Sequence, residues 1–141
     1  MSPTITAAGA LGARLLLASI FLHEAWSKLG AYAAAAAYMK TFGVPGELLP
    51  AAIAVELGGG VLIVLGLYTR AAALILFGFC IATAALFHTN LGNRNELLHF
   101  ETDLAIAGGF LALFAFGGGA WSLDAWRKSK SETATAAEAG H

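Results

Sequence analysis

The stretch that decides the fold is residues 49–88, which read LPAAIAVELGGGVLIVLGLYTRAAALILFGFCIATAALFH. A membrane-spanning helix needs about 20 mainly apolar residues. The stretch contains two such runs, Leu49–Tyr68 and Ala71–His88, and Thr69-Arg70 forms a tight link between them. It therefore predicts two consecutive membrane helices.

Two more apolar runs of similar length lie on either side, at Leu11–Gly30 and Leu98–Gly117. Glycine, proline and asparagine mark the connections between the runs, at residues 43–46 and 90–95. We therefore predict an all-α fold, a membrane four-helix bundle. The alanine-rich segment at residues 31–41 contains two tyrosines, and we expect it to form a short helix at the membrane interface.

The composition excludes several classes of protein. Of the 141 residues, 58% are hydrophobic and 12% are charged, whereas a soluble domain carries about 25% charged residues. The mean hydropathy of +0.72 agrees with this and excludes a soluble enzyme with a polar shell. A net charge of −1 provides no basic surface, so we expect no nucleic-acid partner. The single cysteine, Cys80, excludes an internal disulfide.

The chain divides into one domain and a tail. Residues 1–126 form the predicted four-helix domain, and the polar, unpatterned residues 127–141 are expected to be disordered. The first apolar run could instead be a signal peptide. We favour a retained helix because Arg14 lies inside the run and Lys28 lies near its end, whereas signal peptides carry their positive charge before the apolar core.

The distribution of positive charge predicts the orientation. Four spans place both termini on the same side of the membrane as the Thr69-Arg70 link. That side has more positive residues, namely Arg14, Arg70, Arg127, Lys128 and Lys130, against Lys28, Lys40 and Arg94 on the other. Positive residues favour the cytoplasm, so we expect both termini to be cytoplasmic and membrane lipid to surround the bundle.

The carboxylates and histidines within the spans lie near the outer ends of their helices, whereas Arg14 lies near the inner end of the first run. At 1.5 Å per residue, Glu24 is about 6 Å from Lys28 and Asp103 is about 6 Å from His99, and Glu56 is about 10 Å from Leu49. Charged groups are costly in lipid and usually face the bundle interior. We therefore predict one cavity, open toward the outer face, formed by groups from all four helices: His23, Glu24, Glu56, His88, His99 and Asp103.

Spacing along the helices refines this prediction. Glu24 and Lys28 are four residues apart, as are His99 and Asp103, so each pair shares a helix face. Phe87 and Phe100 lie beside the histidines as candidate cavity walls. Each pair also has a structural interpretation, as an ion pair or as histidines in the headgroup layer. Glu56, a lone carboxylate in an apolar run, is the strongest functional candidate.

The chain resembles the DoxX family of small four-helix membrane proteins. The resemblance rests on the order and spacing of pieces spread over about residues 11–126, among them Phe42-Gly43-Val44-Pro45, Glu56-Leu57-Gly58-Gly59-Gly60, Leu65–Ala72, Phe87-His88 and Gly117-Gly118-Gly119. It implies a multi-pass protein of a bacterial-type inner (cytoplasmic) membrane. Relatives are linked to quinol oxidation, to thiosulfate oxidation with quinone as acceptor, and to enzyme maturation. Lys28, Glu56 and His88 fit the family pattern, whereas His23-Glu24 and Asp103 depart from it.

Two functional hypotheses follow. In the first, the protein is a redox-linked membrane protein whose cavity takes a quinone or a transition metal. Glu56 and His88 are then the candidate catalytic residues, and Glu24, Lys28, Phe87, His99 and Asp103 are the candidate ligand-binding residues. A metal would draw its ligands from His23, Glu24, Glu56, His88, His99 and Asp103. In the second, the protein is a non-catalytic subunit or assembly factor of a larger membrane oxidoreductase complex.

The orientation can be tested by labelling. A cysteine introduced at Asn93, in a background without Cys80, should react with a membrane-impermeant thiol reagent added outside the cell. Labelling only after permeabilisation would reverse the orientation and place the polar layer on the cytoplasmic side.

Overall fold

The computed structural model describes residues 2–139, and within that range it contains helices and no strands. The elements, in chain order, are α1 (Pro3–Gly30), α2 (Tyr32–Thr41), the short 3-10 helix η1 (Gly46–Leu48), α3 (Leu49–Leu65), α4 (Thr69–Phe87), α5 (Arg94–Phe116) and α6 (Leu123–Ala139). Four segments are long and apolar enough to cross a membrane: Pro3–Gly30, Gly46–Leu65, Thr69–Phe87 and Arg94–Phe116. The predicted all-α bundle with four membrane helices is confirmed.

The helix ends differ from the predicted span ends for local reasons. Helix α1 begins at Pro3, where a proline suits the first helical position because that position needs no backbone N–H donor. Helix α5 begins at Arg94, because the Asn93 side chain accepts hydrogen bonds from the backbone N–H groups of Asn95 and Glu96. The exposed Leu91, which caps nothing, is therefore a better labelling position than Asn93.

The turn between α3 and α4 comes slightly earlier than the sequence indicated. Gly66 and Tyr68 adopt left-handed backbone conformations, with φ of 64° and 48°, and Thr69 already begins α4. A side chain at Gly66 would also collide with its surroundings, since an ideal Cβ there would lie 2.5 Å from Ser122 Cβ. Glycine is therefore required here both by conformation and by space.

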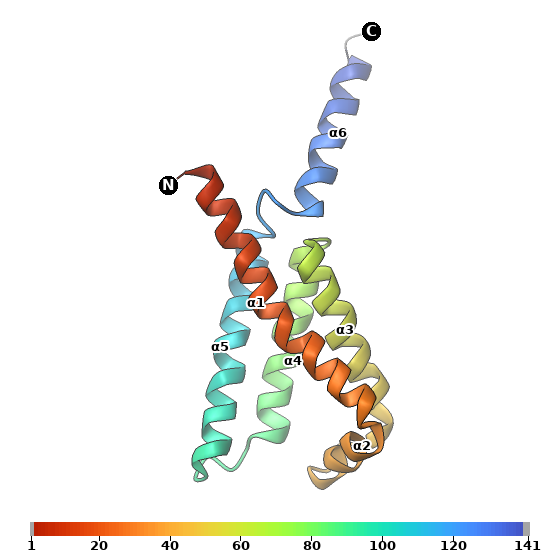
Figure 1. Cartoon of the computed structure of the whole chain (residues 1–141), viewed down its shortest axis with the longest axis vertical. Coiled ribbons are helices and arrows are strands. Elements are labelled where there is room, and N and C mark those ends of the chain that lie inside the picture. The colour runs from red at the N-terminus through yellow and green to blue at the C-terminus, as the bar shows by residue number, and fades with distance from the viewer. Residues whose placement is uncertain (1, 140–141) are drawn as a thin grey trace.

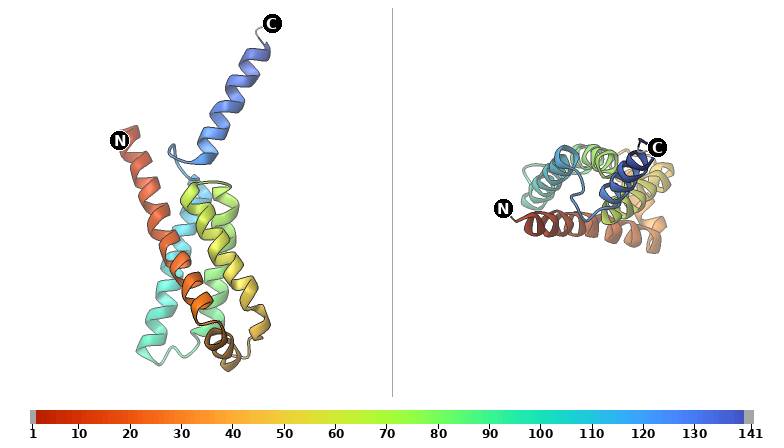
Figure 2. Two further views of the ribbon diagram at one scale, coloured as in Figure 1. Left: turned by 45° about the vertical axis from the view of Figure 1, so that its right-hand side comes forward. Right: turned by 90° about the horizontal axis from the view of Figure 1, so that it is seen from above.

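The four long helices converge at one end and separate at the other. Helix α1 packs on α3, α3 on α4, and α4 on α5, and Figures 1 and 2 show α1 crossing the bundle obliquely. Helices α1 and α5 approach closely where Gly109 lies against the Leu17 side chain, and they diverge toward the end that carries α2 (Figure 1). We call these the Arg14 end and the cavity end.

The first residues of α1 and the last residues of α6 both lie beyond the Arg14 end (Figure 1), as four spans require. Which side of the membrane this end faces stays a prediction. Helix α2 forms at residues 32–41 as expected, and it lies across the cavity end of the bundle.

The Arg14 end is held together by one buried cation. Arg14 is only 2% exposed. Its Nη1 donates to the carbonyl oxygens of Gly118 (2.7 Å) and Trp121 (2.8 Å), and its Nη2 donates to that of Val64 (3.0 Å). One side chain of α1 thus satisfies carbonyl groups at the end of α3 and in the segment that follows α5, where helical backbone leaves acceptors without partners.

Asp124 adds a second connection at the same end. Its carboxylate accepts hydrogen bonds from the backbone N–H groups of Tyr68 and Thr69 and from the Thr69 hydroxyl, each at 2.8 Å. Burial opposes ionisation of Asp124, but the hydrogen bonds from Thr69 and Tyr68 outweigh it and lower the pKa of this carboxyl. Asp124 therefore fixes the start of α6 to the α3–α4 turn.

The tail prediction needs correction. Residues 127–139, expected to be disordered, continue α6 as a helix that extends away from the bundle (Figure 1). The composition is polar, but it contains no glycine or proline until Gly140, and alanine, glutamate and lysine all favour helices. Residues 140 and 141, also part of that prediction, lie outside the described range.

The Arg14 contacts predict a large stability effect. Arg14→Leu should lower the free energy of unfolding by about 3 kcal/mol or more, because three carbonyl oxygens lose a charged donor in a buried site. Arg70→Gln is the matched control, since Arg70 is exposed at the same end and its side chain has no hydrogen bond among residues 2–139. Denaturant unfolding in mild detergent measures both. Equal, small effects would show that Arg14 does not hold this end together.

Candidate functional site

A cavity of about 630 Å³ lies where the helices separate, at the cavity end. Helices α1 to α5 all contribute to its lining. Most of the wall is apolar, and it joins two packed clusters: Phe21 and Cys80 belong to the main core, whereas Met39 and Leu49 belong to a smaller cluster under α2. The volume lies within the range of about 300–1,000 Å³ that is common for small-molecule sites.

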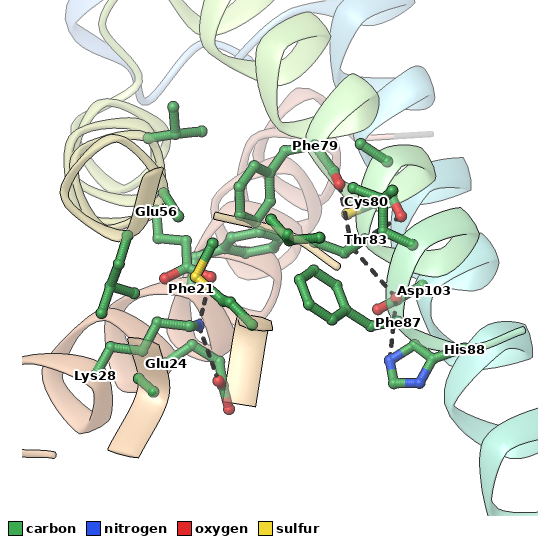
Figure 3. Close-up of a pocket in the computed structure, with 18 of the residues that line it drawn as sticks. Phe21, Glu24, Lys28, Glu56, Phe79, Cys80, Thr83, Phe87, His88 and Asp103 are labelled. Carbon is green, nitrogen blue, oxygen red and sulfur yellow. Dashed lines mark hydrogen bonds and ion pairs between the residues drawn. The ribbon is translucent and has the colours of Figure 1, made fainter. Parts of the chain in front are cut away.

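The functional hypotheses named eight candidate catalytic, ligand-binding or metal-ligating residues. Seven of these line the cavity: Glu24, Lys28, Glu56, Phe87, His88, His99 and Asp103. His23 does not, because it is exposed on another face of α1. The seven are not in one group, however. Figure 3 shows the polar residues on two sides of the cavity, with Phe21 and Phe87 between them.

The first side is an ion-pair cluster formed by Glu24, Lys28 and Glu56. Lys28 Nζ lies 2.7 Å from Glu56 Oε1 and 3.1 Å from Glu24 Oε2. The Glu56 side chain is only 5% exposed, whereas that of Glu24 is 52% exposed. The pair anticipated from sequence, Glu24 with Lys28, is therefore the outer half of a bridge from α1 to α3. Glu56 Oε2 is buried and has no hydrogen-bond partner among residues 2–139.

The second side is a histidine cluster formed by His88, Glu96, His99 and Asp103. His88 Nδ1 lies 3.1 Å from Glu96 Oε2, and His88 Nε2 lies 3.8 Å from Asp103 Oδ2. The rings of His88 and His99 stack, with centroids 5.2 Å apart and 25° between their planes. The Thr83 hydroxyl approaches Asp103 Oδ2 at 3.3 Å.

Aromatic rings close part of the wall between the two sides. Phe87 stacks on Tyr38 of α2, with centroids 6.0 Å apart and 15° between the planes, and meets Phe42 edge-on at 5.3 Å. These contacts attach α2 to the end of α4. Phe87 therefore lines the cavity, whereas Phe100, the other candidate wall residue, does not.

The candidate metal ligands do not form a metal centre. In the part of the chain that the structure describes, no three His, Cys, Asp or Glu side chains are placed to hold one ion. The reason is geometric: Glu24 and Glu56 lie on the opposite side of the cavity from His88 and Asp103 (Figure 3), and His23 is outside it. The ring of His99 stacks on that of His88, so the two rings do not converge on a point. Residues 2–139 therefore offer no group of ligands for one metal ion.

Sequence reasoning missed three residues of this site: Glu96, Thr83 and Tyr38. Glu96 precedes the predicted fourth span, which begins at Leu98, so it was not among the predicted site residues. The spacing of Glu96, His99 and Asp103, three and then four residues, marks one helix face and could have revealed it. Cys80, Thr83 and Phe87 show the same spacing on α4. Tyr38 carries no comparable signal, because only tertiary packing brings α2 to Phe87.

The four long apolar helices and the largely apolar cavity between them define a small integral membrane protein with four spans. The chain belongs to the DoxX family, which it matches over residues 9–89. It is 44% identical to inner membrane protein YqjF of Escherichia coli (strain K12) over 116 residues, which cover 82% of this chain and 89% of that protein. It is 34% identical to inner membrane protein YphA of the same organism over 119 residues, covering 79% and 85%. No solved structure is significantly similar.

These comparisons confirm two expectations. The family is the one that the motifs indicated. The localisation, a multi-pass protein of the inner membrane, agrees with both relatives and with the four membrane-type helices.

The ion-pair cluster predicts a coupled stability effect. Lys28→Met should lower the free energy of unfolding by about 3 kcal/mol, because it leaves the buried Glu56 carboxylate unpaired. The double variant Lys28→Met/Glu56→Leu should recover most of that loss, since it removes both charges.

Glu24→Gln provides the control for this cycle. It removes the exposed partner alone and should change stability by less than about 1 kcal/mol. Unfolding in mild detergent measures the parent, the single variants Lys28→Met and Glu56→Leu, the double variant and Glu24→Gln. Additive losses in the double variant would show that Lys28 and Glu56 do not stabilise each other.

Proposed function

We propose that the protein is a redox-linked membrane protein that binds a quinone in the cavity between its helices. The observation that carries this proposal is the cavity itself, an apolar and aromatic space within the bundle that has polar groups on two opposite sides. A quinone has the complementary form: a flat apolar ring with an oxygen at each end. The kinship with a family linked to quinone chemistry agrees with this.

Hydrogen-bond donors are available on both sides. An ammonium group has three N–H donors, and Lys28 uses two of them on Glu24 and Glu56, so the third remains for a ligand oxygen. Across the cavity, His99 has no side-chain hydrogen bond among residues 2–139, and its ring can donate to the second oxygen. Phe87 and Phe21 lie between the two sides and can pack against the faces of a ring.

Glu56 gives a further indication that a ligand belongs here. A buried acceptor without a partner costs about 1–3 kcal/mol, and Glu56 Oε2 is such an atom. A hydroxyl group on the ring, present when a quinone is reduced, can donate to an oxygen of this kind after a small shift of the Glu56 side chain. The Lys28 ammonium on α1 can then donate to an oxygen of the oxidised ligand, and the Glu56 carboxylate on α3 can accept from a hydroxyl of the reduced ligand.

Direct binding tests the proposal. The protein, purified in mild detergent, is titrated with a short-chain quinone, and the bound fraction is measured by ultrafiltration and absorbance. We expect one quinone per chain. Phe87→Ala should weaken binding by about tenfold, because a ring contact is worth about 1 kcal/mol or more.

Phe116→Ala is the matched control. Phe116 is 86% exposed at the Arg14 end and does not line the cavity, so its loss should leave binding unchanged. Equal effects of the two variants would show that the quinone merely partitions into the detergent. A protein that binds no quinone but copurifies with another subunit would instead support the alternative, a non-catalytic role in a larger oxidoreductase complex.

A further inference from the structure

The histidine cluster forms a continuous series of proton-exchanging groups. Glu96, His88 and Asp103 follow one another in space, with His88 between the two carboxylates. We propose that these three residues form a proton path between the aqueous face at the cavity end and the interior of the cavity. The need for such a path rests on the proposed function, because a quinone that is reduced or re-formed exchanges protons as well as electrons.

Glu96 provides the entry to the path. Its side chain is 30% exposed, and it lies in the first turn of α5, next to the loop at residues 88–93. The Asn93 cap fixes this turn, and the partial positive charge of the helix start favours a carboxylate there. Glu96 does not line the cavity, so it can exchange protons with water without opening the site.

His88 connects the entry to the cavity. An imidazole can take a proton at one ring nitrogen and release one from the other. The two nitrogens of His88 face different carboxylates, Nδ1 toward Glu96 at 3.1 Å and Nε2 toward Asp103 at 3.8 Å. The longer distance exceeds a hydrogen bond, so a small ring rotation or one bridging water completes the second transfer. The side chains of His88 and Asp103 are 18% and 23% exposed, so most of each lies within the protein.

Thr83 allows Asp103 to hold or release a proton at low cost. The single hydroxyl hydrogen of Thr83 has three acceptors in reach: the carbonyl oxygens of Cys80 (2.9 Å) and Phe79 (3.1 Å), and Asp103 Oδ2 (3.3 Å). When Asp103 is ionised, Thr83 can donate to it. When Asp103 is protonated, Thr83 can turn to a carbonyl oxygen and accept from Asp103. Rotation of one hydroxyl therefore serves both states.

The transfer balances without a net change in the path. Asp103 gives its proton to a ligand oxygen in the cavity and takes another from Nε2–H of His88. His88 takes a proton at Nδ1 from the Glu96 carboxyl, and Glu96 is protonated again by water. Return of the His88 ring to its first tautomer completes the cycle, and the same steps in reverse carry a proton out.

The other charged groups near the path do not interrupt it. His99 stacks on the His88 ring but makes no ion pair with Glu96 or Asp103 among residues 2–139. Glu24, Lys28 and Glu56 face the cavity from α1 and α3, on its opposite side. Within the described range, His88 forms its ion pairs with Glu96 and Asp103 and with no third group.

Time-resolved infrared spectroscopy tests the path in quinone-free protein. After a rapid drop in pH, the carboxyl band of Asp103, identified by its absence in Asp103→Asn, reports the arrival of protons. His88→Gln and Glu96→Gln should each slow this band by about tenfold or more, since a positioned acid–base group contributes about 10²–10⁴-fold in catalysis. Imidazole added to the buffer should restore the rate in His88→Ala, which a purely structural role of His88 would not produce.

His23→Gln is the control, since it removes an exposed imidazole that lies outside the cavity and leaves both carboxylate contacts of His88 in place. Its rate should stay within about twofold of the parent rate, because an imidazole outside the path contributes no acid–base step. Unchanged rates in His88→Gln and Glu96→Gln, or an equal loss in His23→Gln, would overturn the path. Because no quinone is present, a failure of the path is distinct from a failure of quinone binding.

Discussion

The contact on which this structure depends is the buried guanidinium of Arg14 and the three carbonyl oxygens around it. It joins α1 to the end of α3 and to the segment after α5, so the bundle is closed at that end. Asp124 reinforces the closure through the α3–α4 turn. Because one end is fixed, α1 and α5 can diverge toward the other without loss of the bundle. The cavity is the consequence of that divergence.

Polar bridges stabilise the open end within each of its two sides. Inside a membrane, charged side chains must find partners within the protein. Lys28 joins α1 to α3 through Glu56, and His88 joins the end of α4 to α5 through Glu96 and Asp103. Helix α2 adds an aromatic contact through Tyr38 and Phe87. The groups that stabilise the walls of the cavity are thus the same groups that could receive a ligand.

Because the same groups stabilise the walls and face the cavity, their division into two clusters determines which kind of ligand fits between them. A single convergent group of ligands would favour a metal ion, whereas two separated polar clusters with aromatic rings between them favour a flat organic ring. Two inner membrane proteins of Escherichia coli are similar in sequence to this chain over most of their length, and their names state a location rather than an activity. The chemistry proposed for this chain therefore depends on the residues that line its cavity.

The sequence by itself determined the four membrane helices, the family, and the layer in which the ionisable residues lie. These follow from local rules: apolar length, glycine and proline punctuation, and the 1.5 Å rise per residue that gives each group its depth. Only the tertiary structure decided which groups meet. Depth along a helix does not fix rotation about its axis, so sequence could not exclude His23, pair Glu56 with Lys28, or separate the two sides. Nor could it show that Arg14, counted only as a positive charge, is the buried link between helices.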